Sequence, residues 1–247
     1  MPSLLAAFAH PDDEAFSVAG TLARAHRGGV AVALLTATDG EAGRITGSAV
    51  RDRAEAARLR RAELLASAGV LGVDRVFTPG YPDGGLEAMP ADDLIGRAVE
   101  VIREVRPDVV ISFGPEGAPT GHPDHKAMAR AATAAFFLAG NGTAFPGAAP
   151  PWQPARLYYH TWEGRIGRTG RGLSEGLAGC PISCRVDITD VLDLKRAAFA
   201  AHRSQQHHRP EFDALLIPCE EYHLAAGAPQ PVALTTDLFE GLHAPAR

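Results

Sequence analysis

Ser-Leu-Leu-Ala-Ala-Phe-Ala-His-Pro-Asp-Asp-Glu, at residues 3–14, predicts how this chain folds and where its chemistry lies. The run Ser3–Ala9 is continuously apolar, as is typical of a strand buried on both faces of a sheet. Pro11 suits the first turn of a following helix, because the N–H that proline lacks has no helical partner there. A buried strand that passes straight into a helix is typical of parallel α/β sheets, which bind ligands where their strands end.

A second segment of the same kind lies far along the chain. Pro107–Phe113 is another strand-like run, and Gly-His-Pro-Asp-His follows it at residues 121–125. Because parallel strands end at one edge of a sheet, we expect the imidazoles and carboxylates of both segments to converge there. Two such clusters at one edge indicate a hydrolytic metal site.

The remaining pattern alternates strands and helices. The predicted strands are residues 3–9, 30–37, 75–78, 107–113, 156–160 and 185–188. The predicted helices are residues 12–26, 51–68 (closed by Gly69), 91–104, 123–139 and 191–203 (capped by Asp190). This alternation predicts an α/β, Rossmann-like fold, with a mostly parallel sheet flanked by helices on both faces. The metal site would lie at the C-terminal edge of the strands.

Two Gly-rich stretches lack this pattern. Residues 140–154 are rich in Gly and Pro and predict a loop, whereas residues 163–181 are Gly- and Arg-rich and predict a mobile or poorly ordered flap. No internal repeat or clear break divides the chain. We therefore expect residues 1–247 to form a single domain, decorated by these two loops.

Composition excludes several function classes. A hydrophobic fraction of 46% and a charged fraction of 21% are those of a soluble globular protein. The formal charge of −5 gives no electrostatic reason to expect binding to nucleic acid or to an anionic membrane. No apolar run approaches the roughly 20 residues of a membrane span, and no signal peptide is evident, so we expect a cytoplasmic protein. The sequence leaves open whether the chain forms a homo-oligomer.

The three cysteines, Cys180, Cys184 and Cys219, are too sparse for a disulfide framework. Cys180 and Cys184 could bind a metal, but the four-ligand pattern of a structural zinc is absent. We interpret all three as reduced thiols.

The first motif carries a ligand pair and a candidate base. His10 and Asp13 offer one nitrogen and one oxygen, and His125 could supply a third ligand. Three protein ligands with an open position are typical of catalytic zinc, which lowers the pKa of bound water towards about 7. The same donor set also suits ferrous iron. Since adjacent carboxylates cannot both point the same way, Asp12 is left as a general base beside the metal-bound water.

The second motif offers an acid. His122 and Asp124 flank His125, and an imidazolium at His122, hydrogen-bonded to Asp124, would stabilise an oxyanion or protonate a leaving amine. Alone, a His-Pro-Asp tripeptide can be no more than a capped helix start. Two of them, each after a predicted buried strand, favour the functional interpretation.

On these motifs the chain resembles the PIG-L/LmbE-like family of metal-dependent N-deacetylases, whose members remove acetyl groups from N-acetylglucosamine-type sugars. The family's two motifs match residues 10–13 and 122–125, and weaker similarity covers residues 38–43, 60–64, 80–84, 195 and 202–205. The resemblance implies zinc ligation by His10, Asp13 and His125. It also implies that Asp12 is the base, that His122 stabilises the oxyanion or donates a proton, and that Asp124 orients a histidine.

Other positions leave alternatives open. Arg60 matches a family arginine that meets the substrate's sugar or an anionic group, or it is one more charge on a solvated helix face. Asp83 and Gly84 line the pocket or form a plain Pro-Asp-Gly turn.

The chain also departs from the family pattern. Some members carry an oxyanion-assisting tyrosine where Pro119-Thr120-Gly121 stands, so Tyr81 or a C-terminal residue substitutes for it, or the assistance is missing. For His202 and Gln205 we expect packing or loop anchoring, and for His207-His208 a solvated pair.

The resulting hypothesis is a zinc-dependent N-deacetylase that removes the acetyl group from a small N-acetylglucosamine-type amino sugar or its conjugate and releases acetate. One alternative is a metal-dependent amidase that cleaves a thiol conjugate or another non-acetyl amide. Another is a non-catalytic ligand-binding protein, which would need neither Asp12 nor His122. The absence of Gly-x-Gly-x-x-Gly after the first strand argues against a dinucleotide site.

Overall fold

A computed structural model describes residues 1–47, 49–147, 149–169 and 172–242. Its main sheet has the strand order β3-β2-β1-β4-β5-β9-β8. The first five of these strands are mutually parallel, and β9 and β8 add antiparallel pairs at one side. The strands of this sheet are β1 (Ser3–Phe8), β2 (Ala31–Thr36), β3 (Arg75–Phe77), β4 (Val109–Phe113), β5 (Arg156–Thr161), β8 (Cys184–Asp187) and β9 (Cys219–Gly227).

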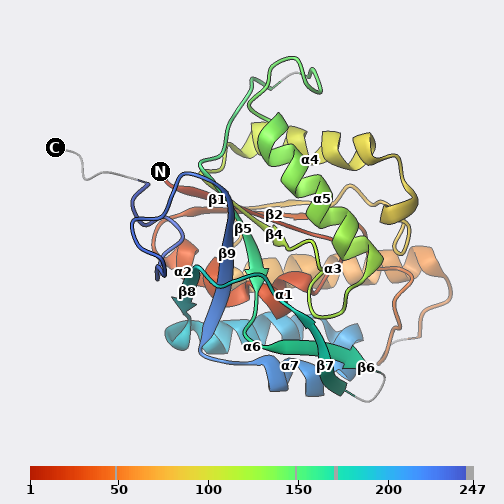
Figure 1. The fold of residues 1–247 in the computed structure, drawn as a ribbon. Coiled ribbons are helices and arrows are strands. Elements are labelled where there is room, and N and C mark those ends of the chain that lie inside the picture. Colours follow the sequence, from red (N-terminus) through yellow and green to blue (C-terminus); the bar gives the residue numbers. More distant parts are fainter. Residues whose placement is uncertain (48, 148, 170–171, 243–247) are drawn as a thin grey trace.

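Helices cover both faces of the sheet (Figure 1). α4 and α5 pack together on one face, and the other face is covered by a group that includes α2, α3 and α6. The helices are α1 (Asp13–Ser17), α2 (Ala19–Arg27), α3 (Arg53–Leu71), α4 (Ala91–Val105), α5 (Pro123–Leu138), α6 (Leu192–Ala201) and α7 (Arg209–Leu215). Short 3-10 turns lie at Leu86–Ala88, Thr189–Val191 and Arg203–His208. The predicted α/β, mostly parallel architecture is thus confirmed.

The central strands explain why the apolar runs were informative. Almost every residue of β1, β2 and β4 is buried, because helices pack on both faces of these strands. β1 pairs with β2 on one side and with β4 on the other, in parallel register. The segments that follow β1 and β4 therefore emerge side by side at one edge of the sheet.

The helix predicted over residues 12–26 is in fact two helices. α1 ends at Ser17, Val18 leaves helical geometry, and α2 begins at Ala19. Glu220 of β9 caps the new helix start, accepting the N–H groups of Gly20 at 3.0 Å and Thr21 at 2.8 Å. The interruption is therefore stabilised by a carboxylate two hundred positions away, which no local pattern reveals.

Two other helix ends differ from the prediction. α3 runs past Gly69 to Leu71 and stops at Gly72, whose φ of 73° is left-handed. Asp190 does not cap α6, because a 3-10 turn precedes this helix. The Asp190 carboxylate instead lies 3.6 Å from Arg24 Nη1 and 3.9 Å from Arg27 Nη1.

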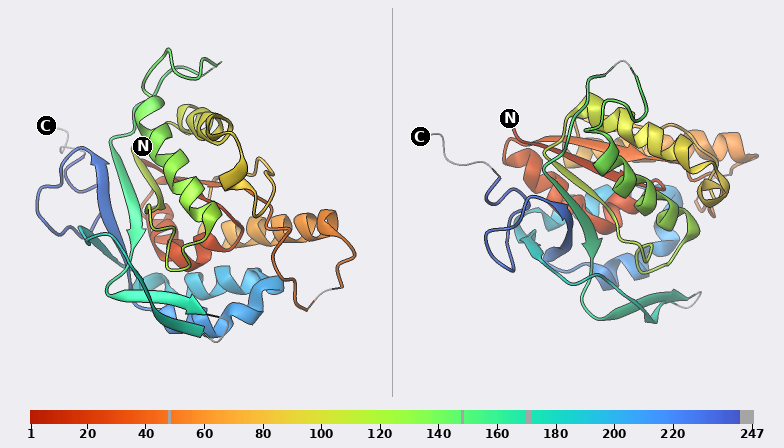
Figure 2. Two further views of the ribbon diagram at one scale, coloured as in Figure 1. Left: turned by 45° about the vertical axis from the view of Figure 1, so that its right-hand side comes forward. Right: turned by 45° about the horizontal axis from the view of Figure 1, so that its top comes forward.

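The expectation of an unstructured flap over residues 163–181 is wrong for the described part of that segment. β6 (Arg165–Thr169) and β7 (Gly172–Ala178) form an antiparallel hairpin, and residues 170–171 lie outside the described residues. The hairpin stands apart from the main sheet, beside α7 (Figure 2). Backbone pairing does not require apolar side chains, so a polar, Gly-rich sequence concealed it. Among the described residues, no helix is both long and apolar enough to cross a membrane.

Candidate metal centre

His10, Asp13 and His125 meet at the edge where β1 and β4 end. His10 follows β1, Asp13 begins α1, and His125 lies in the first turn of α5. The His125 ring stacks on Phe113, the last residue of β4, with ring centroids 4.2 Å apart. Adjacent parallel strands thus bring together two segments that are distant in sequence.

The donor atoms of these residues form a tight triangle. His10 Nδ1 lies 3.2 Å from His125 Nε2, which in turn lies 3.2 Å from Asp13 Oδ1. His10 Nδ1 lies 3.5 Å from Asp13 Oδ2. Tetrahedral zinc with bonds of about 2.0–2.2 Å separates neighbouring donors by roughly 3.4 Å, so the residues present fit such an ion. A ring nitrogen of His122 also lies within 4.8 Å of nitrogens of His10 and His125, so His122 borders the same site.

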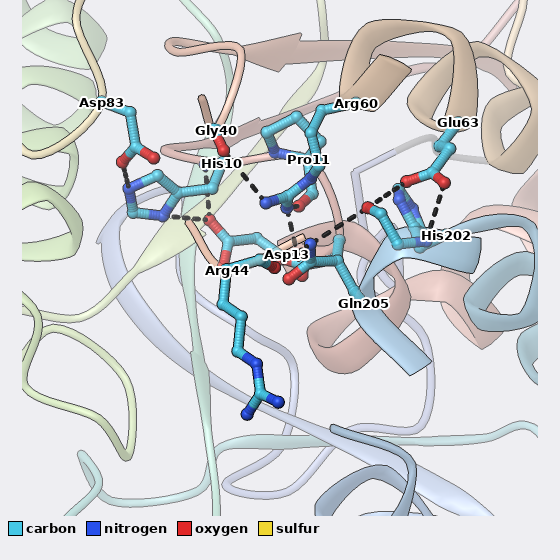
Figure 3. A network of polar contacts seen from close by, with 12 residues as sticks. His10, Pro11, Asp13, Gly40, Arg44, Arg60, Glu63, Asp83, His202 and Gln205 are labelled. Atoms are coloured by element: carbon cyan, nitrogen blue, oxygen red, sulfur yellow. Dashed lines mark hydrogen bonds and ion pairs between the residues drawn. The ribbon is translucent and has the colours of Figure 1, made fainter. Parts of the chain in front are cut away.

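Two carboxylates contact the far side of the His10 ring. His10 Nε2 lies 3.1 Å from Asp83 Oδ1 (Figure 3) and 3.2 Å from Asp124 Oδ2. A metal-binding histidine commonly donates its other N–H to a carboxylate, so these contacts suit ligation through His10 Nδ1. Asp124 is held in turn by the N–H groups of Gly84 at 2.7 Å and Leu86 at 3.0 Å. Although burial opposes ionisation, the bond to His10 lowers the pKa of Asp124.

The expected pairing of the Asp124 carboxylate with His122 is therefore corrected to a pairing with His10. His122 Nδ1 instead accepts the backbone N–H of Asp124 at 3.1 Å. An accepting Nδ1 carries no proton, so His122 is a neutral imidazole with its proton on Nε2. Burial, together with the neighbouring His10 and His125, also lowers the pKa of His122. The imidazolium expected from the sequence is replaced by a neutral donor.

Asp12 lies beside the triangle in an uncommon backbone conformation. Its φ of 99° is left-handed, and its Oδ2 lies 3.2 Å from Arg60 Nη2. Burial raises the pKa of Asp12 to about 6, against the opposing charge of Arg60. A carboxylate that titrates near neutrality suits a general base. Asp13 behaves oppositely, because His125 and His10 overcome its burial and hold its pKa below the usual range.

Arg60 is buried, so the alternative of a solvated helix face is wrong. Only 3% of the residue is exposed, and its guanidinium donates to the carbonyls of Gly40 at 3.2 Å and of Pro11 (Figure 3). Gly40 has a φ of 65°, and a Cβ there would lie 2.9 Å from the guanidinium carbon. The chain thus packs closely around Arg60, which also borders the cavity described below.

Asp83 lies in a turn and also reaches the site. Its Oδ2 accepts the N–H of Ala42 at 2.9 Å, while its Oδ1 faces His10. Tyr81 does not replace the missing tyrosine, because its hydroxyl donates to the carbonyl of Asp93. Among the described residues that line the cavity, none is a tyrosine.

A cavity of about 520 Å³ opens onto the centre. Part of its wall was not predicted from the sequence, namely Phe16, His160, Glu211 and Leu215. Gln205, for which we expected packing or loop anchoring, is buried and donates from Nε2 to the carbonyl of Arg44 at 3.0 Å, and it also lines this cavity. His208, expected to be solvated, lines the cavity as well. The side chain of His160, a residue of β5, lines the cavity. Burial lowers the pKa of His160 to about 4, so its ring is neutral. His160 lies near the C-terminal end of a predicted parallel strand, and this position could have pointed to it, but α7 carries no such signal.

Comparisons with known proteins point to one family. Residues 5–136 match the model of the PIG-L family, described as GlcNAc-PI de-N-acetylase. A 1D-myo-inositol 2-acetamido-2-deoxy-α-D-glucopyranoside deacetylase of Rhodococcus erythropolis is 33% identical over 97% of this chain and 97% of its own.

Two solved structures extend the comparison. A conserved protein of Thermus thermophilus superposes with a TM-score of 0.73 and 28% identity, over 93% of this chain and 97% of its own. The N,N'-diacetylchitobiose deacetylase of Pyrococcus horikoshii shares the fold, with a TM-score of 0.72 and 22% identity over 90% and 83% of the two chains.

Proposed function

The chain belongs to the PIG-L family of de-N-acetylases, and we propose that it is a zinc-dependent hydrolase that removes the acetyl group from an N-acetylglucosamine-type conjugate. The observation that carries this proposal is the donor triangle of His10, Asp13 and His125. It lies beside a carboxylate whose pKa is near neutrality and at the end of a cavity large enough for a sugar conjugate.

In this proposal His10, Asp13 and His125 hold the metal, and His10 is oriented by Asp124 and Asp83. A divalent zinc ion there would supply Lewis acidity, polarising the amide carbonyl and acidifying water. Ferrous iron is the alternative occupant that the same donors would accept.

In this proposal, Asp12 transfers the protons and His122 donates a hydrogen bond. Asp12 accepts a proton from the attacking water, since its carboxylate borders the cavity and Arg60 holds it in place. The Nε2–H of His122 donates a hydrogen bond to the developing oxyanion, because its Nδ1 is already committed as an acceptor. The protonated Asp12 then returns its proton to the leaving amine.

The substrate class follows from the relatives. The Rhodococcus enzyme is named for GlcNAc-inositol, the pseudo-disaccharide 1D-myo-inositol 2-acetamido-2-deoxy-α-D-glucopyranoside, and we propose a conjugate of this class for this chain.

The three cysteines form no disulfide, which suits a reducing compartment such as the cytoplasm.

The experiment is a panel of N-acetylglucosamine, GlcNAc-inositol, N,N'-diacetylchitobiose and N-acyl thiol conjugates, assayed with zinc-loaded protein for free amine and for the released acid. Acetate and a free amino sugar are the expected products. A larger acid would instead identify an amidase, and the absence of any hydrolysis would favour a binding protein.

Three variants test the proposed roles. Asp12→Asn and His122→Ala should lose turnover by about a hundredfold or more while keeping bound zinc, and His10→Ala should lose the metal. Near-normal deacetylation by Asp12→Asn would show that the base is assigned wrongly.

A further inference from the structure

Glu14 is buried directly behind the proposed base. The side chains of Glu14, His202 and Ser67 have essentially no exposure to solvent. Glu14 Oε1 accepts the Ser67 hydroxyl at 2.6 Å and lies 2.6 Å from His202 Nε2. Glu14 Oε2 accepts the backbone N–H of Asp12 at 3.0 Å. One oxygen of this carboxylate is thus fixed by α3 and by the end of α6, and the other is directed at Asp12.

Asp12 needs such support because of its backbone. A φ of 99° is rarely adopted by a residue with a Cβ, and it persists only where surrounding contacts enforce it. Asp12 has no side-chain capping bond of its own at the start of α1. Its N–H is held by Glu14, and Arg60 holds the preceding carbonyl of Pro11.

This conformation separates the two adjacent carboxylates. Asp13 Oδ2 accepts the N–H of His10 at 2.7 Å, which fixes Asp13 at the donor triangle. Asp12 turns the other way, towards Arg60 and the cavity. Relaxation of Asp12 to an ordinary φ would swing its carboxylate away from this position while leaving the triangle in place.

We propose that Glu14, fixed by His202 and Ser67, is a positioning residue that holds Asp12 in its left-handed conformation and so aims the catalytic carboxylate. This inference rests on the proposed role of Asp12 as the general base. It gives the C-terminal segment a function at the site, although His202 is fully buried and is not among the residues that line the cavity.

The chain offers a matched control. Glu220 is also buried, accepts backbone N–H groups at a helix start, and pairs with a basic side chain of α6, Lys195. Glu220 supports α2 rather than Asp12. A purely structural role for Glu14 predicts the same behaviour from both glutamates, whereas positioning predicts that only Glu14 affects turnover.

The experiment compares Glu14→Ala, Ser67→Ala and His202→Asn with Glu220→Ala. For zinc-loaded protein acting on GlcNAc-inositol, Glu14→Ala should lower kcat about tenfold or more, with KM within about twofold and one zinc retained per chain, because small misplacements of a reacting group are costly. Ser67→Ala and His202→Asn should lower kcat less. Glu14→Gln should recover most of kcat, because its amide oxygen can still accept the Asp12 N–H. Glu220→Ala should lower stability but not kcat.

Crystal structures of the variants give a readout that does not depend on activity. In Ser67→Ala, His202→Asn and Glu14→Ala, Asp12 should leave its positive φ or lose its contact with Arg60. A wild-type kcat in all three variants, or an unchanged Asp12 backbone in all three structures, would overturn the proposal. If the wild-type protein hydrolyses nothing in the panel, the proposed function fails, and the structures still decide whether Glu14 positions Asp12.

Discussion

At the scale of single residues, Asp124 shows how a side chain can support the proposed metal site without being a ligand. Its carboxylate lies 3.2 Å from His10 Nε2 and is itself held by two backbone N–H groups. Asp124→Asn would replace one acceptor oxygen by a donor, so His10 would lose orientation and basicity. We expect zinc affinity to fall about 10–100-fold, as measured by competition with a chelator.

Asp108 provides the control for this variant. It accepts the N–H of Ser3 at 2.9 Å at the opposite end of β1, so Asp108→Asn should leave zinc affinity unchanged. Equal zinc affinity in the Asp124 variant and the wild type would show that His10 is oriented by other contacts.

Arg60 holds the Asp12 carboxylate in a geometry that a lysine could not reproduce. Its planar guanidinium reaches the carbonyls of Gly40 and Pro11 and the Asp12 carboxylate at the same time. Arg60→Lys should therefore lower kcat/KM about tenfold or more in the deacetylation assay. Arg61→Lys is the control, because Arg61 is half-exposed and pairs with Asp39 outside the cavity wall. Equal losses in both variants would contradict a specific role for Arg60.

Residue types and spacing were sufficient to predict that His10, Asp13 and His125 lie close together, because all three follow the ends of strands. They were not sufficient to identify the partner of Asp124. That contact depends on the N–H groups of Gly84 and Leu86, which reach Asp124 from a different crossover. The burial of Arg60 was equally hidden, since its helix is rich in charged residues and has no marked apolar face.

At the scale of elements, the Glu220–Lys195 ion pair joins β9, α6 and the start of α2. The Nζ–Oε1 distance is 2.6 Å, and both side chains are at most 5% exposed. Although burial favours the neutral acid, Lys195 and Thr21 hold the pKa of Glu220 below its usual value of 4.5. Glu220→Gln should cost ~3–5 kcal/mol of unfolding free energy at pH 7, because it leaves a buried ammonium unpaired.

The pH dependence of this cost has a definite sign. A carboxyl group with a lowered folded-state pKa stabilises the protein fully above its unfolded pKa, and this contribution is lost as the pH falls through the folded value. The difference between wild type and Glu220→Gln in urea unfolding should be constant from pH 7 to about 5 and shrink in stronger acid. A difference that stays constant down to pH 3 would contradict the assigned pKa direction.

The same pair explains which elements escaped prediction. β9 begins Cys-Glu-Glu, a sequence that is typical of an exposed segment. In the structure Glu220 is buried, and its charge is balanced by Lys195. The break at Val18 escaped for the same reason, because Glu220 supplies the cap from another strand. β1, β2 and β4, by contrast, consist mainly of buried apolar residues, so their sequences were sufficient to predict them.

At the scale of the whole molecule, Arg156 connects the parallel half of the sheet to the C-terminal segment. It begins β5, has no exposed surface, and donates to the carbonyls of Ala228, Pro229, Leu238 and Glu240. Five parallel strands were predictable as βα units. This set of contacts, the Arg156 clamp, could not be predicted, because one arginine donates to carbonyl groups of a segment that has no strand or helix pattern of its own.

Arg156→Met should therefore destabilise the protein in a spatially uneven way. Without the guanidinium, the partly buried carbonyls of Ala228, Pro229 and Glu240 lose this donor, while that of Leu238 keeps the Tyr158 hydroxyl. We therefore expect a loss of ~3 kcal/mol in urea unfolding. In hydrogen exchange, amides of β9 and of residues 228–242 should lose protection first, since they depend on the clamp, while β1 and β4 stay protected. Arg75→Met is the control, because Arg75 is exposed on β3 at the opposite edge of the sheet and should change neither measurement. A uniform loss of protection across all strands would mean that the C-terminal segment and the parallel sheet unfold as one unit, and that the clamp does not set their coupling.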